Sequence, residues 1–196
     1  MGFTLAYELD GILYLNVTNR CYNNCTFCIR KNEKGVGYDL WLDKEPTAKE
    51  ILEAAGDVSK YEEIVFCGYG EPLLRPDIVE TVSKKIKKQS NAKLRINTNG
   101  LAEKVLDLKF LEDLSGLIDI ISISLNAHNA ETYYKLSQPS VGSDAFDHIL
   151  EFARRSKKYI PRVILTVVNT PEVDIEQCRR IAQDIDAEFR VRPHLT

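Results

Sequence analysis

EIVFCGYGEPLLRPDIVETVSKKIKKQSNAKLRINTNG, residues 63–100, contains one complete strand–helix–strand unit. Glu63–Gly68 and Lys93–Thr98 are short runs rich in aliphatic residues, which is typical of strands buried on both faces of a parallel sheet. Between them, Pro76–Ser90 carries apolar residues at helical spacing, with Pro76 or Asp77 as its start signal. Two strands joined by such a helix are usually parallel neighbours, so this segment predicts an α/β fold.

The same alternation continues on both sides of this unit. The other predicted strands are Ile12–Thr18, Ile118–Leu125, Arg162–Val168 and Glu188–Arg192, and the other predicted helices are Thr47–Val58, Glu103–Leu114, Asp144–Lys158 and Ile175–Asp186. Thr4–Leu9 precedes Asp10-Gly11, a turn signal that favours an N-terminal hairpin strand. Six strand–helix units are too few for a closed eightfold barrel, which usually needs about 250 residues. The pattern leaves two architectures open, an incomplete barrel of six strands and a doubly wound flat sheet.

The composition is that of an ordinary globular domain. The chain has 196 residues, of which 44% are hydrophobic and 28% charged, and no linker divides it, so we expect a single domain over residues 1–196. Its 26 basic and 29 acidic residues give a net charge of −3, so the chain has no strong nucleic-acid signature. No run approaches the roughly 18 apolar residues of a membrane span, and the first residues do not form a secretory signal. We therefore expect a cytoplasmic protein with reduced thiols and no membrane partner.

Three of the five cysteines lie within LNVTNRCYNNCTFC, residues 15–28, directly after a predicted strand. Their spacing, C-x3-C-x2-C, places Cys21, Cys25 and Cys28 on one short loop. Three thiolates can hold three irons of a [4Fe–4S] cluster and leave the fourth iron open to another ligand. A structural zinc site needs a fourth ligand, and no other cysteine or histidine has metal spacing. A thioredoxin-like pair of Cys25 and Cys28 leaves Cys21 unexplained.

Four motifs, each at or after a predicted strand, resemble the radical S-adenosylmethionine (SAM) superfamily. An aromatic residue, Phe27, stands immediately before the last cysteine of the first motif, as in that family. The second motif, Gly68-Tyr69-Gly70-Glu71-Pro72, is similar to the Gly-Gly-Glu-Pro motif, with Tyr69 in place of the first paired glycine. The third, Thr98-Asn99-Gly100, and the fourth, Ser124-Leu125-Asn126, are similar to a Thr-Asn-Gly motif and a Ser-Leu-Asp ribose-binding pattern. Within the superfamily, the short chain, the Val-Thr-Asn-Arg-Cys lead-in and the Gly-Tyr-Gly-Glu-Pro form resemble the small TatD-linked radical SAM proteins.

This resemblance implies an incomplete (β/α)6 TIM-like barrel of parallel strands. It also implies an enzyme that reductively cleaves SAM at a [4Fe–4S] cluster, with an electron donor such as flavodoxin or ferredoxin. The 5′-deoxyadenosyl radical would abstract hydrogen from an unidentified small-molecule or peptide substrate. Two alternatives stay open, namely an activase that generates a glycyl radical on a partner protein and a non-catalytic metal-binding module.

The resemblance also assigns site residues. The metal ligands, which are also the predicted catalytic residues, are Cys21, Cys25 and Cys28, and the predicted cofactor-binding residues are Phe27, Gly68, Gly70, Glu71, Pro72, Asn99, Ser124 and Asn126. Glycines allow close approach and unusual dihedrals, so we expect the turn at Gly68–Pro72 to approach the methionyl ammonium of SAM. Substituting Gly70→Val or Glu71→Ala should then weaken SAM binding and leave cluster content intact.

Other chemically interesting residues have simpler interpretations. Arg192 ends the last predicted strand and could pair with a carboxylate of SAM or of the substrate. Cys67 lies beside the glycine turn, whereas Cys178 on the last helix is interpreted as a core residue. His194 is close to the C-terminus and is not a preferred catalytic candidate. The long irregular stretch Ile29–Pro46 has the length of a functional loop.

Overall fold

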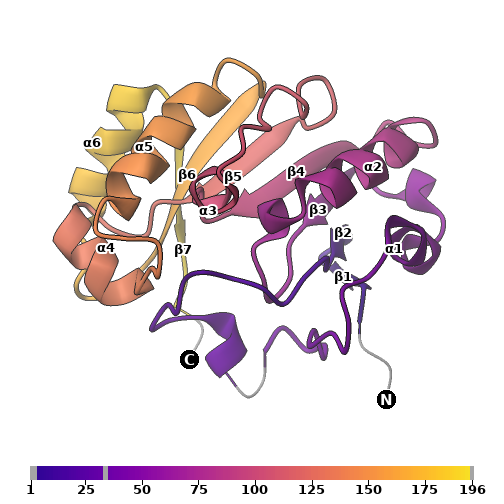
Figure 1. The fold of residues 1–196 in the computed structure, drawn as a ribbon, viewed down its shortest axis with the longest axis horizontal. Helices are drawn as coiled ribbons and strands as arrows, with labels where there is room; N and C mark the ends of the chain where they lie inside the picture. The colour runs from indigo at the N-terminus through magenta and orange to yellow at the C-terminus, as the bar shows by residue number, and fades with distance from the viewer. Residues whose placement is uncertain (1–3, 33–34, 195–196) are drawn as a thin grey trace.

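The parallel strands follow one another across the sheet in the order in which they occur along the chain (Figure 1). The computed structural model describes residues 4–32 and 35–194. Its seven-stranded sheet consists of β1 Ala6–Leu9, β2 Ile12–Leu15, β3 Glu63–Phe66, β4 Lys93–Thr98, β5 Ile120–Ser124, β6 Arg162–Val168 and β7 Glu188–Arg192. β2 to β7 are parallel, and β1 is antiparallel to β2 across a tight turn. Asp10 and Gly11 both have positive φ there, as a two-residue hairpin turn requires.

This strand order decides between the two architectures that the strand–helix pattern left open, and it confirms the incomplete barrel that the resemblance implied. A doubly wound sheet reverses its strand order at a switch point, and no reversal occurs here. Within the described residues β1 pairs only with β2 and β7 only with β6, so the sheet does not close. The fold is an incomplete β/α barrel with the predicted N-terminal hairpin.

The helices cover one face of the sheet (Figure 1). They are α1 Ala48–Ala55, α2 Pro76–Lys87, α3 Ala102–Leu106, α4 Ala130–Ser137, α5 Ala145–Ser156 and α6 Ile175–Ile185, and the 3-10 helices are η1 Ile29–Lys31, η2 Val58–Lys60 and η3 Pro72–Leu74. Thr47 and Glu50 form a complete capping box at α1. The predicted helix Glu103–Leu114 is wrong in length because α3 ends at Leu106, and α4 was not predicted.

The two faces of the sheet differ in polarity. Leu94 and Ile96 of β4 and Ile121 and Ile123 of β5 belong to the buried core. On the same strands the alternate positions are polar, as in Arg95, Asn97, Ser122 and Ser124, and they line a cavity on the inner face. These strands are largely buried on both faces, as predicted, since Arg95 and Ser122 are buried as well, but the inner face is polar. The barrel interior is available for polar ligands.

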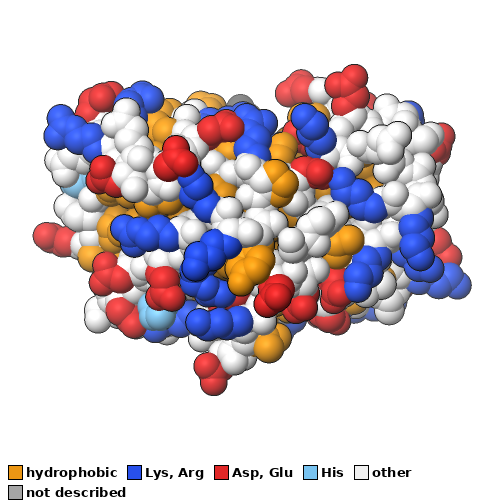
Figure 2. All heavy atoms as spheres, turned by 90° about the horizontal axis from the view of Figure 1, so that it is seen from above, with side chains coloured by type: hydrophobic (Ala, Val, Ile, Leu, Met, Phe, Trp, Pro, Cys, Tyr) orange, Lys and Arg blue, Asp and Glu red, His pale blue; other side chains and the backbone are white. Residues whose placement is uncertain are grey.

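The face of the molecule seen in Figure 2 has no dominant charge. On the face seen from above, lysine and arginine side chains are interspersed with aspartate and glutamate, and apolar side chains occur in small groups (Figure 2). Across residues 4–32 and 35–194, no helix combines the length and apolar character needed to cross a bilayer.

Candidate functional site

A pocket of about 240 Å³, which we call the site pocket, lies where the parallel strands end. It is lined by Cys21, Asn23, Cys25, Phe27, Cys28, Ile29, Cys67, Gly68, Tyr69, Gly70, Glu71, Asn97, Thr98, Asn99, Ser124, Asn126, Val168, Arg192 and Pro193. Every predicted site residue except Pro72 lines this pocket. Pro72 is buried and begins η3 instead. The strand-end loops thus meet at one edge of the sheet, as in other parallel barrels.

The three clustered thiols are free and partly exposed. Burial raises the pKa of Cys21 and raises the pKa of Cys25 to about 11, and the neighbouring thiolates add to the increase at Cys25. The Cys21 and Cys25 thiols therefore resist ionisation. Bound cations would reverse this effect, because a metal ion stabilises the thiolate that ligates it.

The arrangement of these thiols bears on the kind of metal centre they can hold. No three His, Cys, Asp or Glu side chains of the described residues are arranged to hold one common metal ion. A closed zinc site needs four ligands around one ion. In an iron–sulfur cluster each cysteine binds a different iron, so its thiols need not converge on a point. The donor set therefore fits a cluster bound by Cys21, Cys25 and Cys28.

The cysteine loop, residues 16–28, is bound on one side to α4 and the turn after it. Asn23 donates a hydrogen bond to the Tyr133 hydroxyl over 2.9 Å, and the Thr26 amide donates to the Leu136 carbonyl over 2.8 Å. Asn129 caps the N-terminus of α4 and so fixes where this helix begins. The helix that was missed in the sequence is thus a support for the cysteine loop.

On another side, the cysteine loop contacts the glycine turn directly. A Cβ atom at Gly70 would lie 2.3 Å from the Thr18 carbonyl oxygen and 2.7 Å from the Arg20 carbonyl oxygen. A Cβ atom at Gly68 would lie 1.9 Å from Oδ1 of the buried Asn16. Neither glycine has a positive φ. Close approach to the cysteine loop, rather than an unusual dihedral, is therefore the reason for both glycines.

Glu71 is a buried carboxylate that joins three segments. Its Oε1 accepts from the Leu73 amide (3.0 Å) and the Thr98 hydroxyl (2.7 Å), and its Oε2 accepts from the Asn99 amide (2.6 Å). Its own amide donates to the Arg20 carbonyl over 2.8 Å. Burial raises the pKa of Glu71 to about 7, although the three hydrogen bonds act in the opposite direction. Its contacts are those of a residue that holds the turn together.

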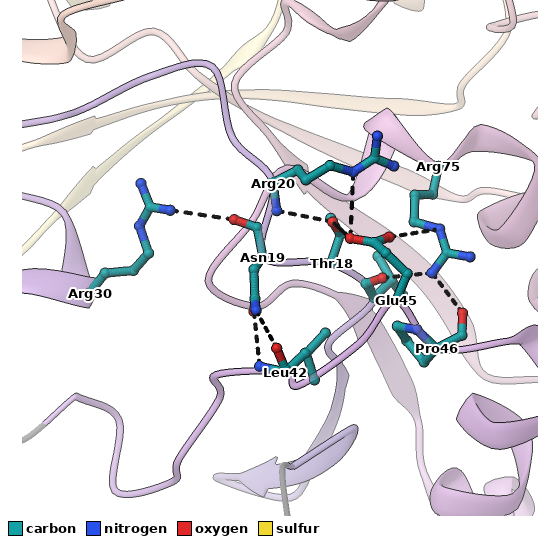
Figure 3. Close-up of polar contacts among 9 residues, drawn as sticks. Thr18, Asn19, Arg20, Arg30, Leu42, Glu45, Pro46 and Arg75 are labelled. Carbon is teal, nitrogen blue, oxygen red and sulfur yellow. Dashed lines mark hydrogen bonds and ion pairs between the residues drawn. The ribbon is translucent and has the colours of Figure 1, made fainter.

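A third support is a polar network between the cysteine loop and residues 42–46 (Figure 3). Arg75 donates to the carbonyls of Val17 (3.0 Å) and Pro46 (2.6 Å) and forms an ion pair with Glu45 (Nε–Oε2, 3.1 Å). Glu45 in turn accepts from the Thr18 hydroxyl over 2.7 Å. The half-buried Arg75 guanidinium therefore connects both segments to the start of α2.

We expect Arg75→Ala to lower the free energy of unfolding by about 2–3 kcal/mol, because charged hydrogen bonds to the cysteine loop are lost. Iron content after anaerobic reconstitution should fall with it. Urea unfolding of the metal-free protein measures the first effect. Arg154→Ala, at an exposed position of α5, is the control. Its free energy of unfolding should stay within about 0.5 kcal/mol of the parental value. Equal stability of the two variants would show that this network does not hold the loop.

The long loop Ile29–Pro46 also reaches the site pocket through aromatic contacts. Trp41 packs edge-on against Tyr69, with ring centroids 5.2 Å apart, and Tyr69 lines the pocket. The Arg30 guanidinium lies over the Trp41 ring. Half of the Trp41 side chain nevertheless remains exposed. Among its described residues this loop therefore supports Tyr69 through Trp41 and lines the pocket with Ile29, and its functional role stays a prediction.

The remaining predicted residues present polar atoms to the pocket. The Asn99 side-chain amide donates to Sγ of Cys21 over 3.7 Å. Asn126 has a left-handed backbone (φ 57°), which asparagine tolerates, and its Oδ1 accepts from Arg192 over 3.1 Å. Arg192 also approaches the Ser124 hydroxyl over 3.5 Å. These groups form a polar wall of the pocket.

Sequence reasoning assigned no role to several residues that line the pocket. Asn97 lies on the inner face of β4, and its Oδ1 is buried without a partner. Cys67 adjoins Asn97, and burial raises the pKa of its thiol. In the sequence, the only signal for Asn97 was the alternation of polar and apolar residues within β4, Lys93–Thr98, which indicates one polar face. Cys178 is fully buried in the core, as predicted.

An incomplete β/α barrel with three clustered thiols beside a polar pocket is the arrangement of a protein that holds a cysteine-bound cluster next to a small polar ligand. The sequence model of the radical SAM superfamily matches residues 15–185. The chain belongs to this superfamily, whose members are enzymes that generally use a [4Fe–4S] cluster and SAM.

Individual relatives share part of their length with this chain. A tungsten-containing aldehyde ferredoxin oxidoreductase cofactor-modifying protein from Pyrococcus furiosus is 28% identical, over 82% of this chain and 44% of the relative. GTP 3′,8-cyclase from Lactiplantibacillus plantarum is 31% identical, over 82% of this chain and 46% of the cyclase. The chain thus spans less than half the length of these two proteins.

A solved structure agrees with the fold. A radical SAM methyltransferase from Sphaerobacter thermophilus aligns with a TM-score of 0.59 and 15% identity, over 96% of this chain and 68% of that chain. The likeness to TatD-linked proteins stays a prediction.

Proposed function

We propose that this protein is a radical SAM enzyme that cleaves SAM reductively in the site pocket. The observation that carries this proposal is the convergence of three free thiols with the Gly68–Pro72 turn and the polar ends of β4 and β5 in one pocket. A [4Fe–4S] cluster bound there would supply an open iron to chelate SAM and an electron to break its bond to the deoxyadenosyl carbon. An external donor such as flavodoxin or ferredoxin would supply that electron.

The chain's own residues bind and orient these groups. Cys21, Cys25 and Cys28 would hold the cluster, and the Asn99 amide donates toward the Cys21 sulfur. Glu71 holds the glycine turn against the cysteine loop, so the methionyl end of SAM meets a fixed backbone.

The other end of SAM would meet Phe27 of the cysteine loop and the polar wall of the pocket. Phe27 packs partly against the core and lines the pocket, where it would contact the adenine. Ser124 and Asn126 would bind the ribose hydroxyls. The wall thus orients the nucleoside relative to the cluster loop.

The direct test is formation of 5′-deoxyadenosine. The reconstituted protein, given SAM and dithionite or a flavodoxin system under anaerobic conditions, should release 5′-deoxyadenosine and methionine slowly even without substrate. The reason is that the cluster loop and the glycine turn are held by contacts within the protein. Liquid chromatography of quenched reactions measures the product. Formation no faster than in a variant that lacks all three cysteines would contradict the proposal.

Asn126→Gly tests the ribose wall. Glycine tolerates the left-handed backbone at this position, so the substitution removes the side chain without adding strain. Losing this polar contact should raise the activation free energy of cleavage by about 1–3 kcal/mol. Cleavage should then slow about tenfold to a hundredfold. Iron content should stay at the parental level. Cleavage at the parental rate would show that Asn126 does not contact the nucleoside.

A further inference from the structure

The inner face of the barrel carries a second and larger hollow of about 710 Å³, which we call the inner cavity. Its polar side chains come from several strands, including Tyr14 of β2, Arg95 of β4, Ser122 of β5, Thr166 of β6 and Arg190 of β7. Asn97, Ser124 and Arg192 line both this cavity and the site pocket. A ligand in the inner cavity would therefore adjoin whatever is bound beside the cysteines.

Two of the four arginines in this cavity are neutralised within it. Arg95 pairs with Glu63 over 2.8 Å, and Arg162 pairs with Glu188 over 2.6 Å. Both pairs lie toward the amino ends of their strands, because Glu63, Arg162 and Glu188 begin β3, β6 and β7. At the end of the cavity that is far from the cysteines, the charges of these two arginines are thus balanced by glutamates.

The other two arginines, both on β7, have no acidic partner in the part of the chain that the structure describes. Among the described residues the side chain of Arg190, an exposed residue, makes no hydrogen bond or ion pair. Arg192 contacts only the neutral groups of Ser124 and Asn126, and its Nε is buried without a partner. The remaining acid of the cavity, Asp10, lies in the β1–β2 turn at the opposite end of the strands. Two positive charges therefore face the half of the cavity that adjoins the site pocket.

Strand register places these groups at successive levels of the sheet. Ser124 is level with Thr166, Thr166 is level with Arg190, and Arg192 lies one inward-facing position closer to the carboxyl ends. Asn97, with its unpartnered buried Oδ1, faces them from β4. Unpaired buried polar atoms are costly, and a ligand that pairs with them removes that cost.

We propose that the inner cavity binds the substrate of this enzyme, and that the substrate is a small-molecule anion whose carboxylate or phosphate group pairs with Arg190. This inference rests on the proposed function. The cavity volume is that of a small-molecule site. Arginine binds both carboxylate and phosphate through paired N–H donors, so the shared chemistry is a multi-oxygen anion. Arg190 receives the anion because Arg192 is already engaged by Ser124 and Asn126.

Calorimetric titration of the anaerobically reconstituted protein with SAM bound tests this inference. The probes are citrate for carboxylates, glucose 6-phosphate for phosphates, and glucose as the uncharged reference. The parent should bind at least one of the two anions and should not bind glucose. Citrate binding alone would identify a carboxylate ligand, and glucose 6-phosphate binding alone a phosphate.

Arg190→Gln should weaken that binding between about tenfold and a hundredfold, and Arg190→Lys, which keeps the charge, should recover part of it. Arg154→Gln, at an exposed position of α5, should bind the anions with the affinity of the parent. Circular dichroism and iron content verify that each variant is folded and loaded. Binding of neither anion, equal binding of glucose, or parental affinity in Arg190→Gln would overturn the inference.

The proposed function has a separate readout. Release of 5′-deoxyadenosine by the parent protein without any probe tests it alone. Absence of that release, with anion binding that depends on Arg190, would count against the enzyme activity and leave the anion site in place.

Discussion

Substitution of Cys21, Cys25 or Cys28 by alanine is expected to abolish cluster binding. The parent should hold about four irons and four sulfides per chain after anaerobic reconstitution, and each variant close to none. The described cysteine loop at the pocket edge has no other cysteine that could replace one of the three thiols. A cluster attached by two thiolates would lack its third protein ligand. Colorimetric iron and sulfide assays, together with the visible absorption band, measure the effect.

Cys67→Ala and Cys178→Ala are the matched controls, and both should keep the cluster. Cys67 lines the site pocket but follows β3 rather than belonging to the cysteine loop, and Cys178 is buried on α6. A thermal melt of the Cys178 variant checks its fold, since this residue is in the core. Stoichiometric zinc without iron in anaerobically prepared parent protein would contradict the cluster assignment.

Gly70→Val is expected to lower both stability and cluster content. The new side chain would begin 2.3 Å from the Thr18 carbonyl oxygen, which is part of the backbone and cannot rotate away. We expect a loss of about 3 kcal/mol in the free energy of unfolding of the metal-free protein. The cysteine loop must shift to admit the side chain, so iron content should fall as well. Urea unfolding and iron assays measure the two effects.

This expectation differs from the one drawn from the sequence, in which Gly70→Val affects SAM binding alone. The structure changes it because Gly70 faces residues 18–20 just before Cys21. Ala54→Val on the exposed side of α1 adds methyl groups without contacts, and should cost only about 0.5 kcal/mol. A Gly70→Val protein with parental iron content and weakened SAM binding would restore the earlier interpretation.

Local sequence patterns predicted much of the fold. Lys93–Thr98, Arg162–Val168 and Glu188–Arg192 are strands with the predicted bounds, because β-branched and aliphatic runs between turn signals are a local property. The capping box of Thr47 and Glu50 is likewise local. In contrast, α4 is short, and its packing against residues 23–26 depends on a contact more than 100 residues away in the chain.

The candidate site divides in the same way. Its motifs were identified in the sequence by their resemblance to a known family. They were expected to meet because parallel strands end at a common edge. The contacts that hold these residues in place could not be predicted from the sequence. Arg75 reaches Val17 and Glu71 reaches Thr98 only after the strands have paired, since both contacts join segments far apart in the sequence.

The sequence by itself thus determined the strand–helix alternation, the thiol spacing and which loops carry polar groups, all of which depend on neighbouring residues. Only the tertiary structure decided the order of the strands, and with it the choice of an open barrel over a flat sheet. It also decided that Arg190 and Arg192 face an inner cavity without acidic partners among the described residues. The physical reason is that charge balance and burial are sums over atoms from many strands, and no local stretch of sequence contains them.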